Sequence, residues 1–458
     1  MKEGKLTLSR RNLLRAAAAA GAASLAAACG PTPQPPAATV ETAATVPPTA
    51  SQEAETIIFW EPDTSDQQIA RTTPVYMKFN EVQTQYKLDL SHGKNEEAVL
   101  AAVAAGTPPD VYWRWNVNTY GSWINKGVIQ DLTPFVDAST LDWSRFVPIS
   151  LESCKWRGKY YGMPLTSAGL GLFYWNKPML EKAGLDPNTP PKDLDELLAF
   201  ADKAIVRDDA GNISALGFHW NFGHVEWPPH FNAKFWDPDS EQITPTDPGM
   251  VACYQWVADY YDRYGADALD RFFTGFPGGG YYGDAHPLCK DMVASLGGFE
   301  WDWPFMTLYA KCEESKFGFG RMLNPAGHPD YPVTGQGTVP VVMPTGAPHP
   351  RAGWAYMEYL QTAEAAGEIG AVLVNAAQVK DAIEVPAYAN NPVLKLCTEI
   401  NTSGNVVAWC GPIPVAAEYA DELGKAYDLI IHGKVAAEEG LQAVYDRVQP
   451  QLDKALGK

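Results

Sequence analysis

The amino-acid sequence predicts an α/β fold divided into two lobes. Between residues 56 and 113, segments with the patterns of strand, helix, strand, helix and strand follow one another. This alternation indicates an α/β lobe with a parallel sheet. The chain continues to residue 458, and about 400 folded residues exceed what one hydrophobic core usually organises. Apolar residues make up 46% of the sequence, an ordinary share for a globular protein.

The elements of the first lobe are predicted from local composition and periodicity. Residues 56–60 (TIIFW) are rich in β-branched and aromatic side chains and end at a polar turn. The helix predicted over residues 96–105 has apolar residues on one face and ends at Gly106, before two prolines. The other elements expected here are a helix around residues 73–82 and strands at residues 86–90 and 110–113.

Later helices are marked by caps and apolar stripes. Asp193 can cap a helix in which Glu196 follows three residues later, and leucines with Ala201 and Ile205 form one apolar stripe. Residues 217–247 are irregular, aromatic and rich in proline. Further helices are predicted at residues 250–264, 354–361 and 441–448.

The N-terminus has the pattern of an export signal. Residues 8–15 (LSRRNLLR) are basic and precede an alanine-rich stretch that ends at Cys29. The paired arginines resemble a twin-arginine signal, and Cys29 resembles the lipid-modified cysteine of a bacterial lipoprotein. The apolar stretch of residues 16–28 is too short for a membrane-spanning helix; a disordered basic tail is the other alternative. Ala26 stands three residues before Cys29, where a larger apolar residue is usual in lipoprotein signals. This departure weakens the prediction of lipidation more than the prediction of export.

We therefore expect residues 1–28 to be a removed signal peptide and residues 29–55 to be a disordered Pro/Thr/Ala tether. The mature protein would be exported to the cell envelope or extracellular face and held to the membrane only through lipid on Cys29.

The chain carries a net charge of −19, and residues 1–28 carry +4, so the mature part carries −23. This charge argues against nucleic-acid partners, and against anionic ligands unless a local basic pocket overrides it.

Seven cysteines are present, and six remain after Cys29 is assigned to lipid. An even number in an exported protein allows up to three disulfides. Cys397 and Cys410 are the preferred pair because they bracket the turn-rich residues 401–405, and Cys289 with Cys312 is the second choice. Buried free thiols are the alternative.

Several short motifs occur in an order that resembles one protein family. They include AAGTPPDV at residues 104–111, GVIQDLTP at residues 127–134, GKYYGMP at residues 158–164 and YWNK at residues 174–177. Together they resemble the extracellular solute-binding proteins (family 1) of bacterial ABC importers, and most of all the sugar-binding branch, which is similar to maltodextrin binders. The resemblance spans nearly the whole mature chain.

The resemblance implies a two-lobed periplasmic-binding-protein-like fold. Each lobe would be a sheet flanked by helices, with the ligand cleft at the hinge. The chain would cross between the lobes near residues 162–167, 320–323 and 375–380. The expected first lobe comprises residues 56–163 and 323–377, and the expected second lobe comprises residues 164–322 and 378–458.

The resemblance also implies a function. We expect a monomeric, non-enzymatic receptor that captures a mono- or oligosaccharide without a cofactor and delivers it to the permease subunits of an ABC importer. One alternative is a secreted carbohydrate-active enzyme, in which two of Glu61, Asp63, Glu300 and Asp302 would face each other as catalytic carboxylates. Another is the same clamp binding a phosphorylated polyol, a polyamine or a peptide.

A sugar site needs aromatic rings for stacking and polar groups for hydroxyls. Ligands of open α/β sheets bind beyond the carboxyl ends of strands. This rule selects Trp60, Glu61 and Asp63 after the first strand, and Trp113, Trp115, Asn116 and Asn118 after the strand at residues 110–113. The resemblance implies that Trp115 and Asn118 are the better candidates of the second group, with the alternative that one of the two tryptophans fills the core. The resemblance adds Tyr174, although Trp175 could face the cleft instead. It also adds the run Glu300, Trp301, Asp302 and Trp303 of the second lobe. Further candidates are Trp220, where a packed loop is the alternative, Tyr282 in a glycine-rich turn, and Trp409.

Two patterns in the sequence resemble a dinucleotide-binding motif and a zinc site, but neither is interpreted as one. Residues 278–283 match G-x-G-x-x-G, but nothing before them has the pattern of a strand and Pro287 follows soon after. His219, His224, Glu226 and His230 are close in sequence, but their spacing does not suit zinc. We expect neither a dinucleotide nor a metal.

Overall fold

The computed structural model describes residues 54–167, 169–276, 280–282, 285–334, 337–407 and 411–458. The predicted signal peptide, Cys29 and the tether up to residue 53 lie outside the described residues, as do Trp409 and Cys410. In the described part of the chain, no helix combines the length and apolar character needed to span a bilayer.

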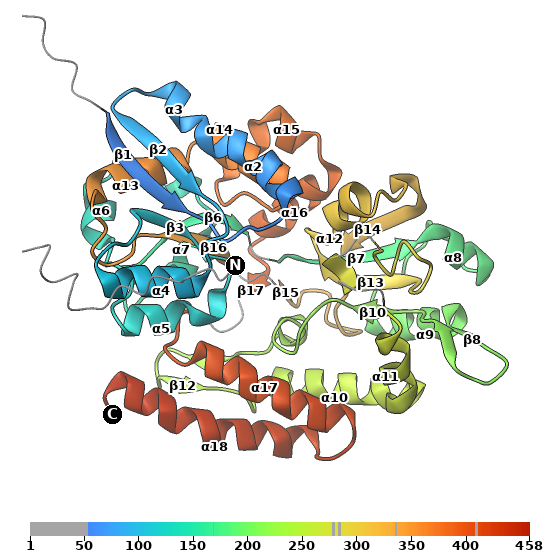
Figure 1. Ribbon diagram of the computed structural model, residues 1–458. Coiled ribbons are helices and arrows are strands. Elements are labelled where there is room, and N and C mark those ends of the chain that lie inside the picture. The colour runs from blue at the N-terminus through green and yellow to red at the C-terminus, as the bar shows by residue number, and fades with distance from the viewer. Residues whose placement is uncertain (1–53, 168, 277–279, 283–284, 335–336, 408–410) are drawn as a thin grey trace, which may run out of the picture. The chain divides into compact units, whose positions relative to one another are not determined.

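The first sheet has the strand order β2-β1-β3-β16-β6 (Figure 1). The parallel arrangement is confirmed for the three N-terminal strands, because β1 pairs in parallel with β2 and with β3. β16 is antiparallel to both β3 and β6, so the complete sheet is mixed. The strands are β1 (Glu55–Trp60), β2 (Tyr86–Ser91), β3 (Val111–Trp113), β6 (Met163–Ser167) and β16 (Thr338–Val342).

Helices cover both faces of this sheet, as alternation along β3 shows. Trp113 packs against Tyr76 on one face, and Tyr112 stacks on Trp123 on the other. The first face is covered by α2 (Asp66–Met77), α13 (Pro350–Tyr359) and α14 (Ala363–Leu373), and the second by α4 (Glu96–Ala105) and α5 (Tyr120–Asn125).

The second sheet has the order β10-β13-β7-β14. β7 lies in the middle, antiparallel to both of its neighbours, while β10 is parallel to β13. Every residue of β7 and β13 is buried. The strands are β7 (Gly171–Asn176), β10 (His219–Trp220), β13 (Ser295–Phe299) and β14 (Phe317–Arg321).

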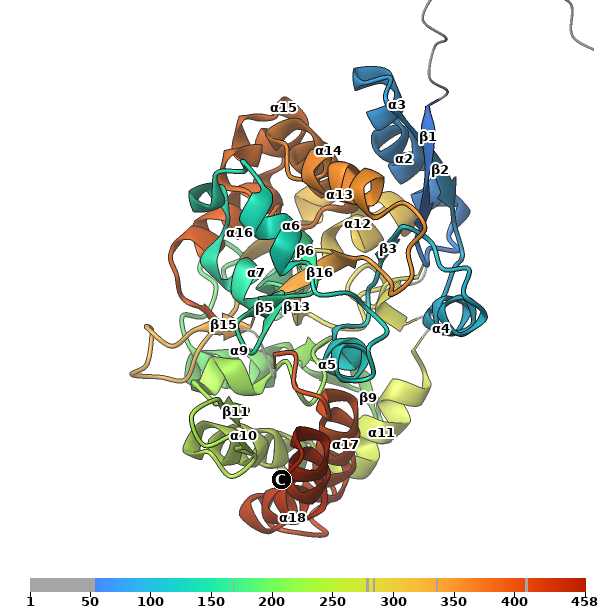
Figure 2. The same cartoon turned by 90° about the vertical axis from the view of Figure 1, so that its left-hand side faces the viewer.

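Long helices accompany the second sheet. α17 (Ala416–Ile431) and α18 (Ala437–Leu456) lie side by side and pack on α10 (Pro248–Tyr264), as both overall views show (Figures 1 and 2). The two sheets with their helices form the two lobes that the sequence predicted.

The end of β6 coincides with the first predicted crossing, near residues 162–167, but the strand itself lies in the first sheet. Residue 163 was expected to end the first lobe, but β6 pairs with β16 over residues 163–167 and therefore belongs to the first sheet. Ser167 at its end bonds to the third predicted crossing: its N–H donates to the Ala376 carbonyl at 2.7 Å, and its own carbonyl accepts from Asn375 Nδ2 at 3.1 Å. Two predicted crossings are therefore hydrogen-bonded to each other.

Most helices form where local signals placed them. α4 has the predicted bounds, and Asp193 caps α9 (Leu194–Ala204) by accepting from the N–H groups of Asp195 and Glu196. The helix expected at residues 73–82 begins earlier, because Ser65 caps α2 through the Gln68 N–H. It also breaks at Lys78, after which α3 (Phe79–Val82) forms.

One disulfide joins Cys289 to Cys312, the second choice from the sequence. The preferred bond from Cys397 to Cys410 is corrected, because Cys397 is a free thiol on the buried face of α16 (Pro392–Thr402). Burial raises the pKa of the Cys397 thiol well above its ordinary value. Turn-rich sequence between two cysteines therefore did not predict which of them pair.

The variant Cys289→Ser/Cys312→Ser is expected to lose about 3 kcal/mol of unfolding free energy, because the bond closes a loop of 23 residues in the unfolded chain. Urea unfolding of the wild type and the variant measures this loss. Dithiothreitol should destabilise the wild type and leave the variant unchanged. Equal effects of dithiothreitol on both proteins would contradict the prediction.

Candidate functional site

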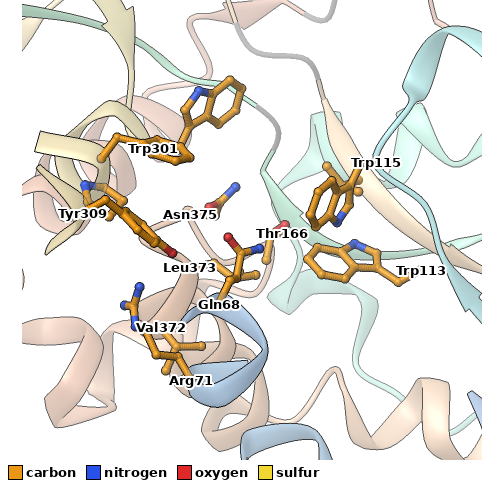
Figure 3. Close-up of a pocket in the computed structure, with 13 residues that line it drawn as sticks. Gln68, Arg71, Trp113, Trp115, Thr166, Trp301, Tyr309, Val372, Leu373 and Asn375 are labelled. Carbon is orange, nitrogen blue, oxygen red and sulfur yellow. The ribbon is translucent and has the colours of Figure 1, made fainter. Parts of the chain in front are cut away.

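A cavity of about 470 Å³ lies between the two lobes (Figure 3). Its volume is in the range of small-molecule sites, which is about 300–1,000 Å³. The first lobe contributes strand residues and helix α2 to its wall, and the second lobe contributes the turn and short helices that follow β13. The lining residues are Gln68, Arg71, Trp113, Trp115, Thr166, Trp301, Pro304, Phe305, Tyr309, Val339, Val372, Leu373 and Asn375.

One wall carries two tryptophans at the carboxyl end of β3. Trp113 is buried and packs against Tyr76. Trp115 is 42% exposed and meets Trp113 edge to face, with ring centroids 5.5 Å apart. A large apolar ring left this exposed inside a cavity is available for stacking.

The opposite wall is the turn that follows β13, and it carries Trp301. The Trp301 ring lies against Phe299, with centroids 4.4 Å apart. Phe305 and Tyr309 extend this wall from the π-helical turn η5 (Phe305–Tyr309). In Figure 3, Trp301 and Tyr309 lie across the cavity from Trp113 and Trp115.

The carboxylates around Trp301 point away from the cavity and hold the backbone. Glu300 Oε2 accepts from the Leu170 N–H at 2.6 Å, just before β7. Asp302 accepts from the Phe299 N–H at 2.6 Å and from Asn221 Nδ2 at 2.9 Å. Both side chains are fully buried. The tryptophans and carboxylates predicted here as one binding motif therefore have different roles. Trp301 lines the cavity, and Glu300 and Asp302 fix the turn that carries Trp301.

Burial raises the pKa of Glu300 to about 8. The N–H groups of Glu300, Leu170 and Gly169 oppose this shift by stabilising the carboxylate, whereas the charge of Asp302 adds to it. Among the described residues, Glu300 Oε1 has no hydrogen-bond partner. Glu300 is thus a buried acid that is protonated over much of the neutral range.

Two polar atoms of the lining are buried without a partner among the described residues. They are the Thr166 hydroxyl in β6 and the Trp113 indole Nε1. Buried polar groups are nearly always hydrogen-bonded, and each one left unpaired costs about 1–3 kcal/mol. Both atoms are closed off from solvent as well, so a ligand in the cavity does not reach them unless the surrounding side chains move.

The residues predicted after β1 do not line the cavity. The buried carboxylate of Glu61 accepts from the Asp63 N–H at 2.8 Å and pairs with His92. Asp63 accepts from the Ser65 N–H at 2.9 Å, and the Trp60 ring lies under Lys94. Burial raises the pKa of both Glu61 and Asp63. These side chains shape the loop that leads into α2.

Other predicted residues lie in the core. Tyr174 is fully buried and donates to the Phe299 carbonyl at 2.8 Å, and Trp175 donates to the Pro187 carbonyl at 2.9 Å, so neither lines the cavity. Trp303 stacks on Tyr174. Trp220 is buried in an aromatic cluster with Tyr260, with ring centroids 4.8 Å apart. Large aromatic side chains serve packing here because their burial stabilises the fold.

Asn118 is half-buried in the short helical turn η1 (Val117–Thr119) and is not among the lining residues. The backbone of Tyr282 is helical, and its side chain lies outside the described residues, as does all of Trp409.

The prediction missed several polar and aromatic lining residues. Gln68 and Arg71 come from the first turns of α2, where the sequence pattern alone does not orient the helix. Phe305 and Tyr309 follow the Trp301 motif within nine residues. Asn375 begins a segment that was predicted only as a crossing.

Fold and cavity together define the class: a two-lobed ligand-binding protein whose site is built from both lobes. Residues 61–367, more than half of the chain, match the model of the bacterial extracellular solute-binding protein family. The chain belongs to this family.

Part of the chain is 32% identical, over 150 residues, to the sn-glycerol-3-phosphate-binding periplasmic protein of Yersinia pestis. The match covers 31% of this chain and about a third (33%) of that protein.

Solved structures share the fold at low identity. CpMnBP1 with mannobiose bound has a TM-score of 0.71 and 21% identity, with 86% of this chain and 99% of that chain covered. A solute-binding protein of an ABC transporter from Thermotoga lettingae, bound with α-D-tagatose, has a TM-score of 0.68 and 18% identity. That match covers 87% of this chain and all (100%) of the other.

Proposed function

We propose that this protein is the substrate-binding component of an ABC importer and captures a carbohydrate between its lobes. The observation that carries the proposal is the cavity itself, in which Trp115 and Trp301 lie on opposite walls and the lining also carries the amide side chains of Gln68 and Asn375. A sugar presents an apolar ring face and a rim of hydroxyls, which match these two features.

The comparisons support the ligand class. Two proteins of the same fold hold mannobiose and α-D-tagatose in their structures, and a partial relative is described as binding sn-glycerol 3-phosphate. All three ligands are polyhydroxylated. The shared chemistry favours a carbohydrate or polyol over a peptide or polyamine.

Hinge closure is the proposed mechanism of capture. The lining comes from both lobes, and the connecting segments at Ser167 and Ala376 are bonded to each other. Rotation about these segments would bring Trp301 and Trp115 together around the ligand and exclude water. The closed form would then dock on the permease, and an exported protein anchored through Cys29 by the tether of residues 29–55 would remain beside it.

A carbohydrate-active enzyme is disfavoured by the use of its candidate carboxylates. Glu61, Asp63, Glu300 and Asp302 each accept hydrogen bonds from backbone N–H groups and hold loops. None of the four lines the cavity. They therefore do not form the facing pair that glycoside hydrolysis requires.

A thermal-shift screen of the purified protein tests the proposal. A carbohydrate present at 100 times its Kd should add about 2.7 kcal/mol to the unfolding free energy and raise the melting temperature. The screen includes mono- and oligosaccharides, a polyamine, a short peptide and sn-glycerol 3-phosphate. A shift with the polyamine or the peptide and with no carbohydrate or polyol would defeat the proposal.

A further inference from the structure

We propose that the ligand of this cavity is a carbohydrate or polyol that bears an anionic group, a carboxylate or a phosphate, and that Arg71 pairs with that group. This inference rests on the proposed function and narrows its ligand class.

The first observation is the charge of the lining. Arg71 is the one charged side chain among the described residues that line the cavity, and the others are aromatic, aliphatic, hydroxyl or amide side chains. A site for neutral sugars commonly includes carboxylates that accept hydrogen bonds from hydroxyls. Here the carboxylates nearest in sequence to the lining tryptophans, Glu300 and Asp302, are occupied by the backbone.

The second observation is that Arg71 is unpaired. Its side chain is half-buried, and within the described residues its guanidinium makes no ion pair or hydrogen bond. Other partly or fully buried arginines of the first lobe do have carboxylate partners: Arg145 bonds to Asp381 at 2.8 Å and Arg114 to Glu96 at 2.8 Å. The missing counter-charge of Arg71 is therefore a local property of the cavity.

The third observation is orientation. Gln68 and Arg71 are three residues apart on α2, so their side chains leave the same face of the helix. Both line the cavity, and Figure 3 shows the Tyr309 hydroxyl directed to the same part of it. A guanidinium flanked by an amide and a hydroxyl offers several donors to an anionic oxygen.

Energetics then favour an anionic ligand. Closure of the lobes would remove water from Arg71, and an isolated charge is costly to desolvate unless it is paired. A carboxylate or phosphate supplies the counter-charge and can bond to the guanidinium in a bidentate manner. The net charge of −19 repels anions at long range, but salt screens that field beyond about 8 Å, so the local cation decides.

Matched ligand pairs test this inference by isothermal titration calorimetry. The pairs are galactose with galacturonate, glucose with glucose 1-phosphate, and glycerol with sn-glycerol 3-phosphate. We expect the anionic member of at least one pair to bind at least tenfold more tightly than its neutral partner. Galacturonate and the phosphates separate a carboxylate ligand from a phosphorylated one.

Arg71→Gln is expected to weaken binding of that anion at least tenfold more than it weakens binding of the neutral partner, whereas Arg71→Lys should retain part of the preference. Arg271→Gln, on the exposed surface of α11 (Ala266–Thr274), is the matched control and should bind as the wild type does.

Four outcomes would overturn the inference. If neutral members bind as tightly as their anionic partners, or if Arg71→Gln weakens both equally, Arg71 is a general hydrogen-bond donor and the proposed function still stands. If Arg71→Gln changes no affinity, Arg71 does not contact the ligand. If no carbohydrate or polyol binds at all, the proposed function itself fails.

Discussion

Trp301→Ala is expected to weaken carbohydrate binding by about 30-fold or more. The ring forms one wall of the cavity opposite Trp115, and its loss removes a stacking surface at the centre of the site. A central aromatic contact is commonly worth about 2 kcal/mol or more, which corresponds to about 30-fold in Kd. Calorimetric titration with the best ligand of the screen measures the change.

Two further variants make this result specific. Trp301→Phe should recover part of the affinity, because a smaller ring can still stack. Leu308→Ala lies in the same η5 turn, is 46% exposed and does not line the cavity, so it should bind as the wild type does. An unchanged affinity in Trp301→Ala would remove this residue from the site.

The free energy of unfolding is expected to fall as the pH rises from about 4.5 to about 8, through the titration of Glu300. The pKa of Glu300 is raised from 4.5 to about 8 in the folded state. In this window the folded protein holds a proton that the unfolded chain releases, so stability decreases as pH increases. The contribution is fully present below pH 4.5 and is lost once the pH exceeds about 8.

Glu300→Gln should flatten this slope, because the amide keeps the shape of the protonated acid and does not titrate. The full shift corresponds to a loss of at most about 5 kcal/mol across the window. Urea unfolding at several pH values measures it, and Glu418→Gln, on an exposed face of α17, is the control. Identical pH slopes in the wild type and Glu300→Gln would contradict the buried-acid interpretation.

Local signals in the sequence were sufficient for much of the fold. The Asp193 cap and the bounds of α4 depend on residues a few positions apart, so their pattern is visible without tertiary information. The pairing of the strands was harder to predict from the sequence. The chain forms the second sheet before it returns to the first one, where β16 pairs antiparallel with β3. No local sequence pattern indicates this long-range pairing.

The site was predictable where it follows the ends of strands. That rule selected both Trp113 and Trp115, the family resemblance favoured Trp115 and added Trp301, and all three line the cavity. Whether they contact a ligand stays a prediction. Glu61 and Glu300 occupy equally suitable positions in the sequence, but their side chains turn inward to bond backbone N–H groups. The sequence does not show which way these side chains point, because their direction depends on which backbone N–H groups of the folded loops need a hydrogen-bond acceptor.

Arg71 was missed for a different reason. It lies on a helix that begins earlier than predicted, and the acidic composition of the chain argued against an anionic ligand. Its proposed role depends on the whole set of lining residues, because Arg71 is the one charged side chain among those that the structure describes.

A crystal structure of the protein with the carbohydrate or polyol that gives the largest thermal shift tests the central claim most directly. The account predicts a ligand in the cavity between the lobes, with a sugar ring, where the ligand has one, against Trp115 or Trp301. It also predicts ligand hydroxyls within hydrogen-bond distance of the amide of Gln68 or Asn375. A ligand bound elsewhere on the protein, with this cavity filled only by water, would contradict the account.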